Sequence, residues 1–276
     1  MARAWPGTLP LLLALLLGLA GAPAAEEAGA LRSAAGVVPR NAAAAGALVW
    51  VHPFARELPA PDAPAFAGRL VAAGWDLWRF DRVGGPDPLA EGAERLAAGT
   101  AALRARGYRR IVLLGESRGA FVMLVALRYP NLADALVLAA PAAHGRRPER
   151  RPQALADFAA ALDGAHRDAP ERLALFLFDD DPWDPDPTAR AALFRAAAIR
   201  LGRPALVVDR PPAPIGHGGL QEPEFDRLFG TCLAPSSTRP GRPPPAPEAA
   251  RRWPNRIGPA GVCILPSAKG TRRHGP

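Results

Sequence analysis

The chain has 276 residues, of which 49% are apolar and 22% charged, so it is long and apolar enough to bury a full core as one domain. Its formal net charge of +8 comes from Arg3 and from residues 234–276, which hold eight basic residues and one acid. Residues 25–233 are therefore neutral overall, which excludes a basic footprint for nucleic acid on the predicted folded part.

Residues 1–24 have the three parts of a secretory signal peptide. Arg3 forms a short basic start, residues 8–20 are apolar, and small residues follow at 22–25, so we expect cleavage after Ala24 or Ala25. The apolar run is shorter than the roughly 20 residues that span a bilayer, so no stable membrane anchor is expected. The sequence thus predicts a secreted or periplasmic protein, in which Cys232 and Cys263 could pair.

From residue 47 onward, short apolar runs alternate with helical patterns. The predicted strands are 47–51, 75–80, 111–114, 135–140, 173–178 and 205–209, and the predicted helices are 63–73, 88–106, 120–129, 152–166, 188–201 and 222–229. Such βα repeats predict an α/β fold: a mostly parallel, doubly wound sheet of about six strands with helices on both faces. The preceding Ala-rich segment is either a linker or an edge hairpin.

The predicted α/β domain covers residues 25–233, and the pattern ends after it. Residues 234–276 are rich in Pro, Arg and Gly, which cannot build regular ladders or bury much surface, so we expect a disordered tail. Residues 141–172 suffice for one helix and a linker, so no large lid is expected over the site.

The sharpest motif is the sequence Gly-Glu-Ser-Arg-Gly at residues 115–119. It directly follows the predicted strand 111–114 and directly precedes an apolar helix, which is the context of a nucleophile elbow. A turn this tight holds the serine in a strained backbone conformation, and the two glycines remove side chains that would collide there. Ser117 is therefore the predicted nucleophile.

A serine nucleophile needs a histidine base and an orienting carboxylate, which follow it in the chain order Ser, Asp, His. His217 follows the last predicted strand. The competitor His144 precedes the aspartate cluster, His166 lies in a predicted helix before that cluster, and His274 is in the tail. The acid should follow the strand 173–178, where aspartates occupy positions 179, 180, 181 and 184. We favour Asp181, three residues past the strand end, with Asp184 as the alternative acid.

The chain resembles the α/β-hydrolase superfamily over roughly residues 45–233, in particular the compact bacterial serine esterases and dienelactone-hydrolase-like members. Besides the triad, Trp-Val-His-Pro at residues 50–53 resembles the family's His-Gly element, and residues 79–84 resemble its Arg-x-Asp-x-x-Gly turn. Pro53 replaces the family glycine and has no N–H group. The resemblance therefore implies an oxyanion hole formed by the backbone N–H groups of Phe54 and Arg118, with His52 in a structural role.

The sequence leaves open the roles of two residues of the motif, and it assigns one to a tryptophan of the acid loop. Arg118 either steers an anionic substrate or joins a structural ion pair, and Glu116 is either its partner or a group that faces the pocket. Trp183, on the acid loop, is the tryptophan expected to line a pocket.

The sequence therefore predicts an exported serine hydrolase that cleaves small or soluble carboxylic esters through an acyl-enzyme, without metal or organic cofactor. The same triad also serves peptidases, thioesterases and acyltransferases, and a non-catalytic binding protein on this scaffold is a further alternative. The sequence does not indicate an oligomeric state.

Overall fold

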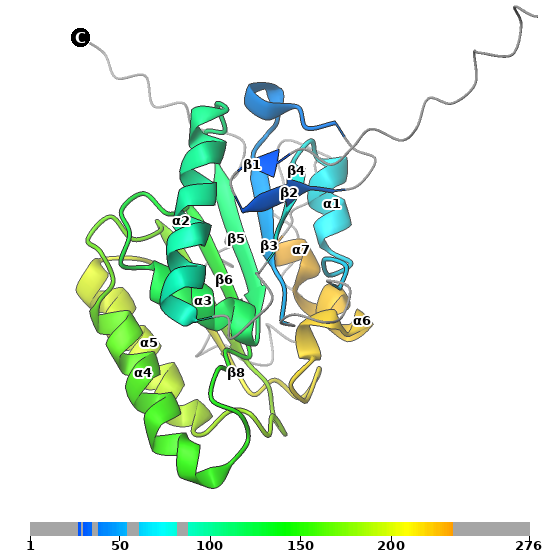
Figure 1. Ribbon diagram of the computed structural model, residues 1–276. Coiled ribbons are helices and arrows are strands. Elements are labelled where there is room, and N and C mark those ends of the chain that lie inside the picture. The colour runs from blue at the N-terminus through cyan, green and yellow to red at the C-terminus, as the bar shows by residue number, and fades with distance from the viewer. Residues whose placement is uncertain (1–26, 29, 35–37, 54–60, 82–87, 234–276) are drawn as a thin grey trace, which may run out of the picture.

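An eight-stranded sheet forms the centre of the protein (Figure 1), in strand order β1-β2-β4-β3-β5-β6-β7-β8. The structure is a computed structural model, and it describes residues 27–28, 30–34, 38–53, 61–81 and 88–233. The predicted signal peptide 1–24, the predicted tail 234–276 and Cys263 lie outside the described residues. Within the described part, no helix is long and apolar enough to cross a membrane.

Six parallel strands confirm the predicted sheet. They are β3 (Ala47–Val51), β4 (Asp76–Phe80), β5 (Ile111–Glu116), β6 (Ala135–Ala139), β7 (Arg172–Leu177) and β8 (Ala205–Asp209). All adjacent pairs in the series β4-β3-β5-β6-β7-β8 are parallel. Strand β6 ends one residue before the predicted position because Ala140 has a positive φ of 43°, which turns the backbone out of the sheet.

The sheet has eight strands rather than the six expected. The two additional strands, β1 (Glu27–Ala28) and β2 (Leu31–Ser33), form an antiparallel hairpin, and β2 pairs antiparallel with β4, the last strand of the parallel series. Of the two readings of the segment before residue 47, the edge hairpin is therefore correct.

Helices cover both faces of the sheet (Figure 1). One face carries α2 (Leu89–Ala105), α3 (Arg118–Ala126), α4 (Arg151–Asp163) and α5 (Pro187–Leu201), and the other carries α1 (Ala67–Ala72), α6 (Pro223–Phe225) and α7 (Thr231–Leu233). The predicted helix 222–229 consists of α6 followed by a π-helical segment, Asp226–Gly230. Short 3-10 turns lie at Asn41–Ala43, Pro148–Arg150 and Gly219–Gln221.

Two hydrophobic cores, one on each face, hold these layers together. Alternate residues of β3 divide between them: Val49 and Val51 face the core under α2 to α5, while Leu48 and Trp50 face the core under α1 and α6. Because both faces are covered, the parallel strands are buried almost throughout, which explains their continuous apolar runs.

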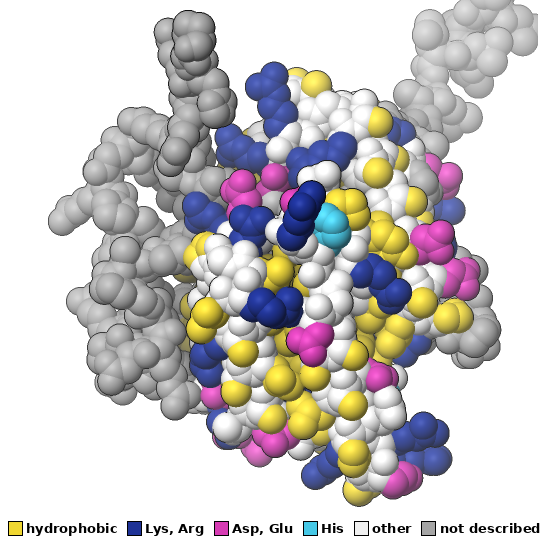
Figure 2. Space-filling model, turned by 90° about the vertical axis from the view of Figure 1, so that its left-hand side faces the viewer, with side chains coloured by type: hydrophobic (Ala, Val, Ile, Leu, Met, Phe, Trp, Pro, Cys, Tyr) yellow, Lys and Arg dark blue, Asp and Glu magenta, His cyan; other side chains and the backbone are white. Residues whose placement is uncertain are grey.

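The outer face seen in Figure 2 has a mixed character. Basic, acidic and apolar side chains are interspersed on it. Among the described residues, many surface arginines pair with a carboxylate, as Arg69 does with Asp226 and Arg104 with Asp134.

Candidate active site

The Gly-Glu-Ser-Arg-Gly motif forms a one-residue turn between β5 and α3. Ser117 has φ 52° and ψ −122°, a conformation that L residues rarely adopt, and helix α3 begins at the next residue. A Cβ at position 119 would overlap the Val51 carbonyl oxygen, so glycine is sterically required there. A Cβ at position 115 would displace the Met123 sulfur and would lie 3.0 Å from the Ala120 backbone nitrogen, so glycine gives the close fit of β5 to α3. The turn is fixed by Ser117 N–H, which donates to the Ala139 carbonyl at 3.0 Å.

His217 lies on the loop that follows β8, and the fold brings it to the nucleophile. Its Nε2 atom is 2.7 Å from the Ser117 Oγ atom, across 100 positions of sequence. The loop is anchored to the acid-bearing loop by Gly216 N–H, which donates to the Asp179 carbonyl at 2.7 Å. The His217 side chain is 22% exposed, so the base remains accessible from solvent.

Asp181 lies on the loop after β7 and contacts the other side of the imidazole ring. The His217 Nδ1 atom is 2.9 Å from Asp181 Oδ1 and 3.0 Å from Oδ2. The carboxylate also accepts a hydrogen bond of 2.8 Å from the Trp183 N–H group, and its side chain is only 2% exposed. Asp181, His217 and Ser117 thus form one continuous hydrogen-bonded chain.

Asp184, the alternative acid, lies elsewhere. Its Oδ1 atom is 3.5 Å from Arg190 Nε and accepts a hydrogen bond of 3.0 Å from the Asp186 N–H group. Burial raises the pKa of Asp184 and lowers that of Arg190, because desolvation exceeds the mutual attraction in this pair. The Arg190 guanidinium also donates to the Pro141 carbonyl at 2.6 Å.

The other predicted candidates take no part in this hydrogen-bonded chain. The competing acids Asp179 and Asp180 are exposed. The His144 Nε2 atom is 2.7 Å from Asp157, and the His166 Nδ1 atom accepts a hydrogen bond from the Asp168 N–H group. His52 is buried, and His274 lies outside the described residues.

A cavity of about 400 Å³ opens above the serine. Its walls come from the elbow, the acid loop, the histidine loop and the segment after β6, and its lining residues are Pro53, Pro61, Glu116, Ser117, Arg118, Ala142, Ala143, Gly145, Trp183, His217, Gly218 and Gln221. The Trp183 ring lies 5.3 Å from the imidazole of His217, so this tryptophan lines the pocket as expected. Among the described residues, α4 contributes none to the lining, and this helix packs against α3 and α5 instead.

The oxyanion-hole residues are described only in part. Arg118 is the first residue of α3, so its N–H group belongs to the helix N-terminus beside Ser117. Its guanidinium donates to the Ala143 carbonyl at 3.4 Å. Phe54, the other expected donor, lies outside the described residues, and Pro53 before it lines the cavity.

Glu116 faces the cavity floor rather than solvent. Burial raises the pKa of Glu116 to about 7, although a hydrogen bond from Gln221 at 3.3 Å favours the ionised form. Its Oε1 atom has no hydrogen-bond partner among the described residues. A carboxyl group with these surroundings is partly neutral near pH 7, and it lies beside the nucleophile.

Two parts of the site were not identified from the sequence. The segment at residues 142–145 lines the cavity, and Arg190 is buried next to the acid loop. The segment 142–145 could have been inferred from its position after β6, the strand next to β5. The carboxyl ends of neighbouring parallel strands meet at one edge of the sheet, so this segment should lie beside Ser117.

Comparisons with solved structures confirm the fold. An acetyl ester-xyloside bifunctional hydrolase from Caldicellulosiruptor lactoaceticus matches with a TM-score of 0.50 and 16% identity, over 72% of this chain and 82% of that chain. The esterase Pf2001 from Pyrococcus furiosus matches with a TM-score of 0.50 and 14% identity, over 81% of this chain and 86% of that chain. No family model and no curated protein matches the sequence. At these identities the likeness establishes the α/β-hydrolase fold alone.

Proposed function

We propose that the protein is a serine hydrolase that cleaves carboxylic esters through an acyl-enzyme. The observation that carries this proposal is the hydrogen-bonded chain from Asp181 through His217 to a serine in a strained turn. Such a chain converts a hydroxyl, which is a poor nucleophile at neutral pH, into one that can transfer its proton as it attacks.

In the proposed reaction, Ser117 Oγ attacks the ester carbonyl carbon while His217 Nε2 takes the hydroxyl proton. Asp181 holds the imidazole through Nδ1 and stabilises the imidazolium. The backbone N–H groups of Arg118 and Phe54 are proposed to stabilise the oxyanion. The intermediate then expels the alcohol, which receives the proton from His217.

The second half of the cycle uses the same groups in the same order. His217 takes a proton from a water molecule, which attacks the acyl carbon. The tetrahedral intermediate collapses, the Ser117 Oγ–acyl bond breaks, and Nε2 returns the proton to Ser117 Oγ. The carboxylic acid product leaves and ionises in solvent. No metal or organic cofactor takes part in this sequence.

Ester hydrolysis is supported by the size of the catalytic cavity and by the neighbours. A cavity of about 400 Å³ has room for the acyl and alcohol parts of a small ester beside Ser117. Two solved structures that match with TM-scores of 0.50 are described as an acetyl ester-xyloside bifunctional hydrolase and an esterase. Peptidase, thioesterase or acyltransferase activity with the same triad remains the alternative set of reactions.

A non-catalytic binding protein on this scaffold is the rival from another class. The contact of 2.7 Å between Ser117 and His217 argues against it, because a pure binding site has no need for an aligned nucleophile and base.

The test is hydrolysis of 4-nitrophenyl esters with acyl chains of two to twelve carbons. We expect turnover that is highest for short chains and that is abolished in Ser117→Ala. Asp180→Asn is the matched control, because this exposed carboxylate lies on the acid loop without contacting His217. Equal turnover in Ser117→Ala and the parent protein would overturn the proposal.

We further propose that the protein is exported after removal of residues 1–24. The basic start, the apolar run and the small residues at 22–25 support this location. N-terminal sequencing of the protein from its native host should begin at Ala25 or Glu26, and a chain that begins at Met1 would contradict export by cleavage.

A further inference from the structure

A second, larger cavity lies next to the catalytic one. Its volume is about 700 Å³, and it is lined by Ala143, His144, Gly145, Arg146, Arg147 and Arg150. Two of these residues, Ala143 and Gly145, also line the catalytic cavity, so the two spaces share a wall. The cavities therefore adjoin at the segment that follows β6.

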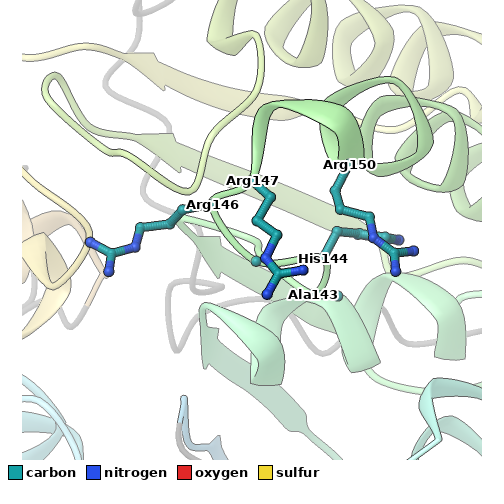
Figure 3. Close-up of a pocket in the computed structure, with 6 residues that line it drawn as sticks. Ala143, His144, Arg146, Arg147 and Arg150 are labelled. Atoms are coloured by element: carbon teal, nitrogen blue, oxygen red, sulfur yellow. The ribbon is translucent and has the colours of Figure 1, made fainter.

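The lining of this second cavity is basic. In Figure 3 the side chain of Arg147 extends downward, that of Arg150 downward and to the right, and that of Arg146 to the left, away from the other two. All three arginines are exposed, and no carboxylate of the described residues forms an ion pair with any of them. This differs from Arg69, Arg104 and many other arginines of the described surface, which are paired.

The acids close to these arginines in the chain do not pair with them. Glu149 lies between Arg147 and Arg150 and, among the described residues, forms no ion pair with either. Asp157 is occupied by His144, whose Nε2 atom is 2.7 Å away, and by Gln153, which donates to it at 2.6 Å. The His144 ring is fixed further by the edge of the Phe121 ring at 5.4 Å. His144 therefore forms a fixed part of the cavity wall, and among the described residues no partner occupies the guanidinium groups of Arg147 and Arg150.

A chain of ring contacts places the basic cavity on one side of the reaction centre. The Arg146 guanidinium lies 5.3 Å from the centre of the Trp183 ring, and that ring lies 5.3 Å from the imidazole of His217. His217 must protonate the leaving alcohol, so the alcohol part of a bound ester lies beside His217 and Trp183. Arg146 thus adjoins the alcohol side of the substrate, and Arg147 and Arg150 line the same cavity as Arg146.

We propose that the preferred substrates are esters whose alcohol part carries an anionic group, a carboxylate or a phosphate, held by Arg147 and Arg150 with Arg146 at the shared wall. The planar guanidinium fork matches both anions and can bind either one through two parallel hydrogen bonds. This inference rests on the proposed ester hydrolysis and adds the class of substrate to it.

The kinetic test uses three acetate esters with leaving groups of similar shape. They are 4-acetoxybenzoate, 4-acetoxyphenyl phosphate and the neutral 4-acetoxybenzamide. We expect kcat/KM for at least one anionic ester to exceed that for the neutral ester by about tenfold at low salt, because two exposed charge pairs contribute. The preference should shrink as sodium chloride is raised to 0.5 M, because exposed charges are screened. The two anionic esters show which anion fits.

Arginine variants test whether Arg147 and Arg150 cause the preference for anionic esters. In Arg147→Gln/Arg150→Gln, the ratio of anionic to neutral kcat/KM should fall to near one. Arg167→Gln is the control, because this arginine is 89% exposed and lines neither cavity, so the ratio should stay at its parent value. A parent ratio near one, or a ratio that persists in the double variant, would overturn the inference.

A binding measurement separates this inference from the proposed function. Calorimetric titration of Ser117→Ala should show tighter binding of 4-acetoxybenzoate or 4-acetoxyphenyl phosphate than of 4-acetoxybenzamide, and the double arginine substitution should remove the difference. If no ester is hydrolysed, the proposed function fails and the titration alone decides the arginine site. If the neutral ester turns over but neither anion is bound more tightly, only the present inference fails.

Discussion

Asp181 and Asp184 lie on the same loop, but their replacement by asparagine should have different effects: the change at Asp184 should lower stability, and the change at Asp181 should lower activity. Asp184→Asn removes the counter-charge of Arg190, whose side chain is 1% exposed. Breaking a buried ion pair by removing one partner costs about 3–5 kcal/mol, because the other charge stays buried. For a domain of this size, that is a loss of roughly 10 °C in melting temperature. The triad is untouched, so turnover by the folded protein should be close to that of the parent.

Asp181→Asn should have the opposite effect. An amide at this position cannot stabilise the imidazolium, and it favours the wrong tautomer of His217, so kcat should fall by about four orders of magnitude. The free energy of unfolding should change by no more than about 1 kcal/mol, because the amide oxygen can still accept the hydrogen bond from the Trp183 N–H group.

Urea unfolding followed by circular dichroism measures the free energy of unfolding, and turnover is measured at 20 °C, where both variants should be folded. A double variant, Asp184→Asn/Arg190→Met, supplies the control, because it removes the buried charge and should regain part of the lost stability. If Asp184→Asn is folded but inactive while Asp181→Asn stays active, Asp184 is the orienting acid and the reasoning is refuted.

Three further predictions follow from single features. Gly119→Ala should yield little folded protein, because the added methyl group overlaps the Val51 carbonyl oxygen; a soluble, active variant would show that the elbow can relax. Glu116 has a folded-state pKa of about 7 against 4.5 for the unfolded chain, so its contribution to stability is full below pH 4.5 and is lost as pH rises to about 7. Glu116→Gln should therefore raise the melting temperature at pH 8 relative to the parent. It should also reduce the fall in melting temperature between pH 5 and pH 8; if that fall is the same as in the parent, groups other than Glu116 cause it. Deleting residues 234–276 should change ester turnover and melting temperature little, and a large drop would indicate that the tail docks, for example through a Cys232–Cys263 disulfide.

The six parallel strands could be predicted because burial on both faces leaves an unmistakable pattern. Strands such as β3 and β6 are apolar at every position and are bounded by turn residues, so their limits agree with the structure within a residue or two. The hairpin of β1 and β2 is different. Strands of two and three residues are too short to show an alternation, so the sequence left a linker and a hairpin as equal readings.

Ser117 and His217 could be located because their local contexts are distinctive. The serine lies between a strand and a helix, and the histidine follows the last strand in the order that the triad requires. The aspartates were harder to separate, because four of them share one loop. Asp184 differs from Asp181 because it pairs with Arg190. This arginine is fully buried in α5, although arginine usually occupies a helix surface. No periodic pattern in the sequence indicates such a partner for Asp184.

Ser117 is proposed to be an activated nucleophile, and covalent labelling measures this activation. A fluorophosphonate probe reacts only with a serine whose hydroxyl is activated by a neighbouring base. We predict one adduct per chain in the intact mass spectrum, located on Ser117 by peptide mapping, absent in Ser117→Ala and strongly slowed in His217→Gln. An intact protein that acquires no adduct, or a Ser117→Ala variant that is labelled as fast as the parent, would contradict the account.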